Sequence, residues 1–73
     1  METIPLDPSL PGVRLLQHWI REKTVVSLQV QGGQQFEGVL DWQDPEFLAL
    51  RAQGQDAPVL IRRQALVLIR SLG

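Results

Sequence analysis

The fold is decided by residues 26–44, which read VSLQVQGGQQFEGVLDWQD. Apolar and polar residues alternate on both sides of a glycine pair, and side chains in a strand point to opposite faces at every second residue. The pattern predicts strands at residues 24–31 and 34–43, each with one buried and one exposed face. Gly32 and Gly33 allow the positive φ angles that a tight hairpin turn requires. This stretch therefore predicts a β-hairpin.

The apolar residues of the two predicted strands define the face that we expect to be buried. They are Val26, Leu28 and Val30 on the first strand and Phe36, Gly38, Leu40 and Trp42 on the second. A glycine in the middle of a strand weakens it and usually marks a bend or a close backbone approach. Gly38 therefore indicates a sharp bend or a close backbone approach, as at the corner of a barrel.

The length of 73 residues predicts one small domain. A domain of this size buries only roughly 60% of the surface that its unfolded chain exposes, and such folds usually need disulfides, a metal or self-association. The chain has no Cys and one His, which excludes disulfides and argues against a zinc site. Self-association remains, and we expect no metal and no cofactor.

The expected cellular location and the net charge of the chain limit the classes of function further. We expect a cytoplasmic protein without membrane insertion, because no apolar run approaches the roughly 20 residues of a membrane helix and residues 1–11 lack a secretory pattern. The net charge of −1 argues against nonspecific nucleic-acid binding. The clustering of the seven Lys and Arg residues therefore matters more than their number.

The chain begins with an expected flexible arm, residues 1–9, followed by a domain at 10–71 and a short C-terminal end at 72–73. Residues 12–23 predict an amphipathic helix, with Asp7 or Ser9 as possible caps and Pro11 in its first turn. Its apolar face contains Val13, Leu15, Leu16, Trp19 and Ile20, and its polar side contains Arg14, Gln17, Arg21 and Lys23. These cations either bind a ligand or only complement the helix dipole. His18 is interpreted as a surface or boundary residue, because no second ligand accompanies it.

Three further strands are predicted, at residues 47–51, 59–62 and 65–70. Asp44-Pro45-Glu46 predicts a turn, and residues 52–58 predict a polar hairpin loop. The last two strands are apolar on both faces, which implies cover on both sides. Since an uncovered edge strand promotes aggregation, we expect the terminal strands to pair with neighbouring copies, and pairing that closes gives a ring.

Two polar features suggest a binding function. A ring would repeat the basic turn Arg62-Arg63-Gln64-Ala65 once per subunit, and guanidinium groups suit phosphates and stacked bases. The alternative is a surface turn whose arginines contact nearby carboxylates. The hairpin also carries a polar face rich in glutamine, which either reads bases or only provides solubility; its members are Gln29, Gln31, Gln34 and Gln35.

A helix followed by five short strands, with the spacing Gly33-x4-Gly38-x5-Asp44, resembles the Sm/Lsm superfamily. The N-terminal helix and the short last hairpin are similar to Hfq, its bacterial member. The helix pattern from Leu10 to Ile20 and the Trp42-Gln43-Asp44 segment resemble the cyanobacterial branch. The expected fold is therefore mainly β with an N-terminal α-helix: a Sm-like, strongly bent, five-stranded antiparallel small barrel that assembles into a ring.

The resemblance implies an RNA-binding homohexamer that acts as an RNA chaperone in post-transcriptional regulation. It would bind single-stranded U-rich RNA on the helix-bearing face, A-rich RNA on the opposite face and RNA bodies on its rim. As a chaperone it would help small regulatory RNAs to meet mRNA. The carried-over positions are Arg62, Arg63, Gln64 and Phe47 at the pore, Arg21, Lys23 and Gln17 on the rim, and Gln29, Gly33 and Gln35 on the opposite face.

Several of these positions depart from the family pattern. Gln64 replaces a histidine at the pore, and Gln29 replaces the tyrosine that stacks on adenine. Because stacking contributes roughly 1–3 kcal/mol per base, we expect weaker RNA binding than in the enterobacterial type, above all for A-rich RNA.

Two other functions compete with RNA binding. One is a ring that docks a partner protein, such as a component of the type IV pilus machinery, and binds little RNA. The other is an enzyme, which the sequence disfavours: it has no Cys, a single His, no evident pair of carboxylates and no glycine-rich phosphate loop.

Overall fold

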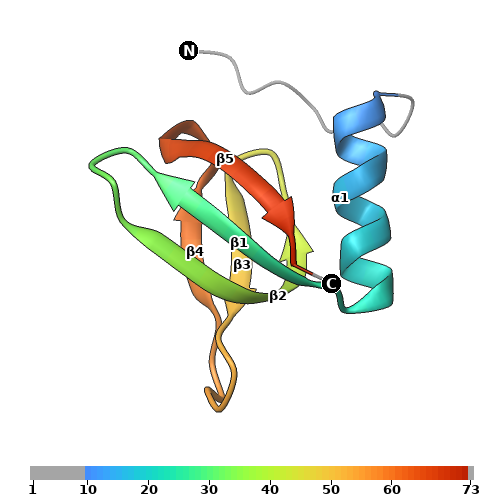
Figure 1. The fold of residues 1–73 in the computed structure, drawn as a ribbon. Coiled ribbons are helices and arrows are strands. Elements are labelled where there is room, and N and C mark those ends of the chain that lie inside the picture. The colour runs from blue at the N-terminus through green and yellow to red at the C-terminus, as the bar shows by residue number, and fades with distance from the viewer. Residues whose placement is uncertain (1–9, 73) are drawn as a thin grey trace.

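The computed structural model describes residues 10–72, which form one helix beside a strongly bent sheet (Figure 1). The elements in chain order are α1 (Pro11–Glu22), β1 (Val25–Val30), β2 (Gln35–Gln43), β3 (Phe47–Arg51), β4 (Val59–Arg62), the 3-10 helix η1 (Arg63–Ala65) and β5 (Leu66–Ser71).

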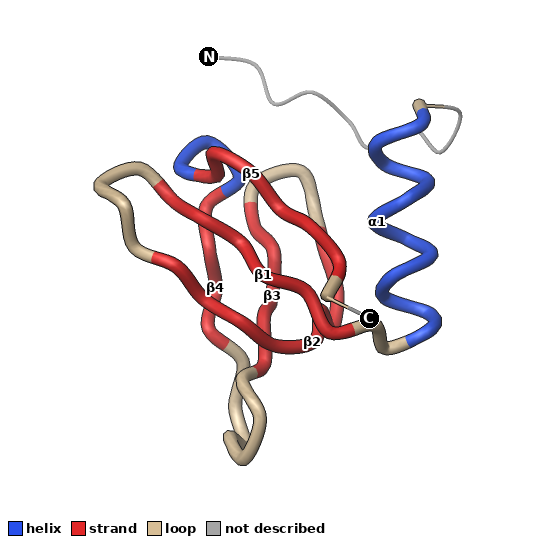
Figure 2. Tube along the Cα trace, in the orientation of Figure 1, coloured by secondary structure: helices blue, strands red, loops and turns tan. Residues whose placement is uncertain are grey.

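All five strands belong to one antiparallel sheet with the order β4-β3-β2-β1-β5. The expected architecture of a helix followed by five antiparallel strands is therefore confirmed. β4 and β5 are the two edges of this sheet. Figure 2 shows the long 52–58 loop between β3 and β4 projecting away from the rest of the sheet.

The helix α1 begins one residue earlier than predicted. Leu10 is its N-cap and makes no side-chain capping hydrogen bond, while Pro11 occupies the first helical position. The predicted caps Asp7 and Ser9 lie outside the described residues. Lys23 ends the helix in the left-handed conformation (φ 53°), and its N–H donates to the carbonyl of Ile20.

The buried side of α1 is narrower than its apolar pattern. Val13 and Leu16 are buried, and Trp19 and Ile20 are partly buried against the core. Leu15 is 48% exposed, so the prediction that it faces the core is wrong. Leu15 instead lines a groove between α1 and β5.

The core lies inside the bent sheet and is closed on one side by α1. Leu16 of the helix packs there with residues from four strands, namely Val26, Leu28, Val30, Leu40, Leu48, Leu50 and Ile61. Val26, Leu28 and Leu40 come from the opening hairpin and are at most 1% exposed. The predicted buried face of β1 is therefore confirmed.

The turn between β1 and β2 depends on the glycine pair. Gly32 and Gly33 have φ angles of 96° and 89°, in the region that side chains disfavour. The Gly33 N–H donates to the Val30 carbonyl at 3.1 Å, and the Val30 N–H donates to the Gln34 carbonyl at 3.0 Å. The expected hairpin is confirmed, with β2 beginning at Gln35.

The central strand β2 changes partners halfway along its length. Its first half pairs with β1, from Gln35 to Val39, and its second half pairs with β3, from Val39 to Gln43. At this point a Cβ on Gly38 would lie 2.8 Å from the carbonyl carbon of Arg51 and closer still to its oxygen. Only glycine allows the backbones to approach so closely, which confirms the predicted close approach.

A β-bulge follows immediately after the bend. The register of β2 against β3 shifts between Leu40 and Trp42, so that Asp41 is the extra residue. A bulge inverts the alternation of the residues beyond it. Trp42 therefore points outward and is 41% exposed, and the prediction that it shares the buried face of Leu40 is wrong. Gln43 turns inward instead, and its Nε2 atom is buried.

Asp44 organises the turn from β2 to β3. Its Oδ1 accepts hydrogen bonds from the backbone N–H groups of Glu46 at 2.8 Å and Phe47 at 2.7 Å. Its own N–H donates to the Phe47 carbonyl at 2.9 Å. An aspartate that binds the backbone two and three residues ahead fixes a turn locally, as predicted for this segment.

We predict that Gly38→Ala lowers the free energy of unfolding by about 3 kcal/mol, because the added methyl group overpacks the contact with the Arg51 backbone. Urea unfolding at fixed protein concentration measures this. Gly12→Ala is the matched control, since a Cβ there meets nothing within 4 Å and alanine favours helix. Equal stability of the two variants would contradict a tight bend at Gly38.

We predict that Asp44→Ala costs about 1–2 kcal/mol, because two backbone N–H groups would be left without their acceptor. Asp44→Asn keeps an acceptor oxygen and should cost much less. Asp41→Ala serves as the comparison: it removes the ion pair with Arg51, whose side chain is 48% exposed while that of Asp41 is 19% exposed. Because solvent screens the more exposed partner, the substitution should cost at most about 1 kcal/mol. The three midpoints in urea give the ranking, and a larger loss of stability for Asp41→Ala would contradict it.

Candidate nucleic-acid interface

The structure brings together the aromatic and the first arginine of the predicted pore site. Phe47 and Arg62 are cross-strand partners at the adjoining ends of β3 and β4. The guanidinium carbon of Arg62 lies 5.9 Å from the centroid of the Phe47 ring, within the range of a cation–π contact. A planar cation and an aromatic ring therefore lie next to each other at this end of the sheet.

The second arginine is held by the segment that leads into β3. The backbone N–H of Arg63 donates to the carbonyl oxygen of Glu46 at 2.9 Å. Its Nη1 donates to Oε1 of Gln43 at 2.7 Å, in a partly buried hydrogen bond. Since Asp44 shapes the intervening turn, the 43–47 segment positions both Phe47 and Arg63.

Gln43 is not among the residues that the sequence predicts for this site. In an uninterrupted strand Gln43 would share the face of Asp41, and the bulge at Asp41 turns it inward toward Arg63. Alternation of apolar and polar residues carries no sign of such a bulge. Only an excess residue in the pairing of β2 with β3 reveals it.

Among the described residues, no carboxylate forms an ion pair with the arginines of the turn. Within residues 10–72, the ion pair joins Arg51 to Asp41, and none involves Arg62 or Arg63. The interpretation of a surface turn with carboxylate-paired arginines therefore lacks its contacts in the described chain. The remaining residue predicted for the pore, Gln64, is exposed and lies directly after Arg63 in η1.

The predicted rim residues lie on the second half of α1 and at its C-cap. Gln17 and Arg21 are four residues apart and so share a face of the helix. Arg21 and Lys23 are exposed, and Lys23 forms the left-handed C-cap. These cations also lie where the helix dipole favours positive charge, so both interpretations of them, ligand binding and dipole complementation, remain.

The opposite-face residues gather at the hairpin. Gln29 and Gln35 are cross-strand partners next to the turn that contains Gly33. Gln29 is half-buried and Gln35 is exposed. The three residues are thus neighbours, although none offers an aromatic ring for stacking on a base.

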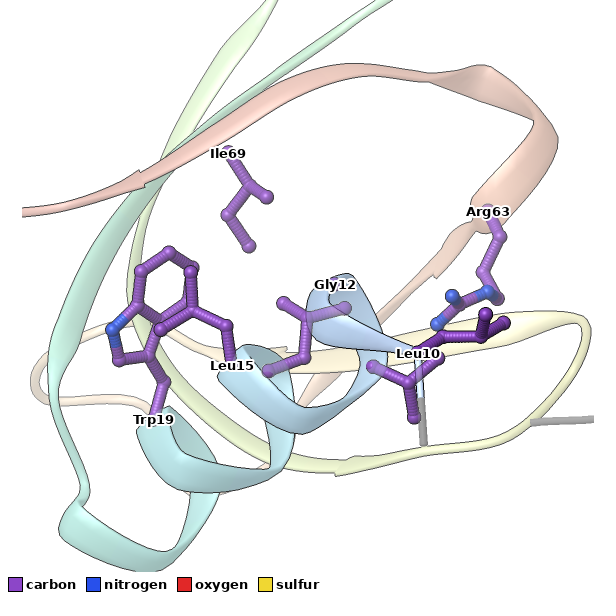
Figure 3. A pocket seen from close by; sticks show the side chains of 8 residues that line it. Leu10, Gly12, Leu15, Trp19, Arg63 and Ile69 are labelled. Atoms are coloured by element: carbon purple, nitrogen blue, oxygen red, sulfur yellow. The ribbon is translucent and has the colours of Figure 1, made fainter. Parts of the chain in front are cut away.

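An apolar groove of about 440 Å³ separates the start of α1 from β5 and η1. Its walls include Leu15, Trp19 and Ile69, and Arg63 and Leu10 lie at one end (Figure 3). Arg63 is therefore the polar end of an otherwise apolar groove. The first turn of α1 beside it contains no acidic residue.

Metal-ligand clusters and membrane-spanning helices would each indicate a class of function. Across residues 10–72, no three residues among His, Asp and Glu gather as a set of metal ligands. No helix in this range has the length and hydropathy needed to cross a bilayer.

The fold of the chain is similar to the folds of solved protein structures. The chain is similar to an Hfq protein from Anabaena sp., with a TM-score of 0.75, 27% identity, and coverage of 85% of this chain and 97% of that chain. It also shares the fold of a structure described as the pleiotropic translational regulator Hfq, with a TM-score of 0.73, 24% identity, and coverage of 80% and 85%. No curated protein sequence matches the chain.

The family comparison covers nearly the whole described chain. A family model described as "Hfq related" matches residues 10–71. This range contains the helix, all five strands and the basic turn. The resemblance inferred from the sequence is thereby confirmed, and the chain belongs to the Hfq-related family with its Sm-like fold.

Proposed function

We propose that this protein is a cytoplasmic, non-enzymatic RNA chaperone that forms a homohexameric ring and binds single-stranded U-rich RNA, small regulatory RNAs and mRNA. The observation that carries the proposal is the clustering of Phe47, Arg62 and Arg63 where β3, β4 and η1 meet. Membership in the Hfq-related family and the fold shared with a translational regulator support it.

The chemistry of the cluster suits single-stranded RNA. Phe47 and the guanidinium of Arg62 offer flat surfaces on which bases stack, an interaction that tolerates any base. Arg63 offers donors for phosphate or base oxygens. Gln64, at the position where the resemblance places a histidine, adds an uncharged donor and acceptor.

The edges of the sheet support assembly into a ring. β4 exposes Val59 and Leu60, and β5 exposes Val67 and Leu68, each between 45% and 57%. Among the strands of residues 10–72, each edge strand has a neighbour on one side only. Pairing of β4 with β5 of the next copy would cover both, and repetition of this pairing closes a ring. The pore cluster would then recur around one mouth.

The other two surfaces are proposed as weaker binding sites. Arg21, Lys23 and Gln17 supply a basic rim, which binds phosphates without reading sequence. Gln29, Gly33 and Gln35 form the opposite surface, where the absence of an aromatic ring supports weak binding of A-rich RNA. We therefore propose that U-rich RNA is preferred and that overall affinity is reduced relative to the enterobacterial type.

Protein docking is the second candidate function. The apolar groove beside α1 favours it, because Leu10, Leu15 and Trp19 leave apolar surface accessible within the chain. In this alternative the ring acts through a partner, such as a protein of the type IV pilus machinery, and RNA binding is secondary.

We predict that oligo(U) binds more tightly than oligo(A), and that Arg62→Ala and Arg63→Ala each weaken oligo(U) binding. Fluorescence anisotropy across a salt series measures both effects. Each phosphate that an arginine no longer neutralises should reduce the salt slope by about 0.7. Phe47→Leu should weaken oligo(U) binding by about 1–3 kcal/mol for each base that stacks there.

Arg14→Ala is the matched control, because it removes the same charge from an exposed position on α1 outside the proposed site. Its binding should equal that of the unchanged protein. No affinity for oligo(U) at low salt, or an equal decrease of affinity in Arg14→Ala and the turn variants, would contradict the RNA function and favour the docking alternative.

A further inference from the structure

The side chain of Arg63 is fixed before any ligand arrives. Nη1 donates to Gln43 Oε1 at 2.7 Å, and the Arg63 backbone is anchored on the Glu46 carbonyl at 2.9 Å. A long side chain that is already ordered loses less conformational entropy when it binds a ligand. The hydrogen bond from Arg63 to the partly buried Gln43 therefore lowers the entropy cost of ligand binding by Arg63.

The hydrogen bond to Arg63 fixes the orientation of the Gln43 amide, and this orientation leaves the other end of the amide without a partner among the described residues. A guanidinium only donates hydrogen bonds, so the amide oxygen must face Arg63 and the Nε2 group must point away. Nε2 is buried, and it has no hydrogen-bond partner within the described residues. Burying an unmatched donor destabilises a fold. Stability alone therefore does not explain an amide at this position.

A second arginine on the same sheet shows what a charged partner would do. Arg51 is held by Asp41, whose carboxylate accepts from Nε at 2.9 Å and from Nη2 at 2.6 Å. Asp41 and Gln43 are two residues apart on β2, yet one holds its arginine with a carboxylate and the other with a neutral amide. The carboxylate compensates the charge of Arg51, whereas the amide leaves the charge of Arg63 available to an anion.

We propose that Gln43 is a positioning residue: it orients the guanidinium of Arg63 toward an RNA phosphate without compensating its charge and without touching RNA itself. This inference rests on the proposed RNA function. It extends that function to a residue on β2, beyond the cluster of Phe47, Arg62 and Arg63.

The test combines two substitutions with the Arg63→Ala background. Gln43→Met keeps the length and removes the acceptor; it should weaken oligo(U) binding about three- to tenfold, as expected for ordering one long side chain on binding. Gln43→Glu keeps the geometry and adds a compensating charge; it should weaken binding further and lower the salt slope by about 0.7 for each phosphate affected. In the Arg63→Ala background Gln43→Met, which adds no charge, should not lower affinity beyond the level of Arg63→Ala alone.

Stability separates this role from a purely structural one. Gln43→Met should change the urea midpoint little, because the loss of the hydrogen bond from Arg63 is offset by the removal of an unmatched buried donor, while affinity falls. A parallel decrease of stability and affinity would overturn the proposal. So would an equal decrease of affinity from Gln43→Met with and without Arg63.

A measurement without RNA keeps the two hypotheses separate. In ¹⁵N-resolved NMR, the Arg63 guanidinium should rotate slowly in the unchanged protein and as fast as exposed Arg14 in Gln43→Met. Equal rotation of Arg63 in both proteins would overturn the positioning role. Failure of the unchanged protein to bind oligo(U) would instead overturn the proposed RNA function, and the NMR comparison would still decide whether Gln43 orients Arg63.

Discussion

The path of β2 depends on the absence of a side chain at Gly38, and the rest of the structure depends on that path. β2 pairs with β1 before this point and with β3 after it, and Val39 alone has partners on both sides. The two halves can diverge only if β2 approaches the backbone of Arg51 and Ala52 at the crossing. This approach lets five short strands surround one core that contains Leu28, Leu40 and Leu48.

The same strand carries the devices that build the site. The bulge at Asp41 inverts the faces, so that Trp42 points outward and Gln43 reaches Arg63. Asp44 then closes the turn and delivers Phe47 to the start of β3, opposite Arg62. Bend, bulge and turn thus follow one another within residues 38–44 and connect the core directly to the basic end of the sheet. In this small domain the residues that shape the fold also position the site.

Much of this arrangement follows from local sequence signals. The predicted bounds of β3 and β4 equal the observed ones, because turn residues mark their ends and their apolar residues are contiguous. The glycine pair predicts the hairpin, and the family resemblance identifies Phe47, Arg62 and Arg63, which the structure places together. These signals act between residues close in sequence, where turn geometry and periodicity decide the outcome.

The predictions fail where the pairing of strands distant in sequence decides which side chains are buried. Periodicity places Trp42 inside because it assumes an unbroken ladder, and the bulge depends on how β2 meets β3. The broad helix pattern places Leu15 inside, whereas the sheet beneath α1 covers only a narrow stripe.

The exposed edges of the sheet connect this fold to its proposed function, because pairing of these edges between copies would form a ring. The ring would repeat the basic turn once per subunit and so concentrate far more positive charge than an isolated chain. The most direct test is the mass of the purified protein in solution, measured by light scattering after nuclease treatment. A homohexameric ring predicts a single species with the mass of a hexamer of the 8.2 kDa chain. A monomer at micromolar concentration would contradict the ring, and with it the shared basis of both candidate functions.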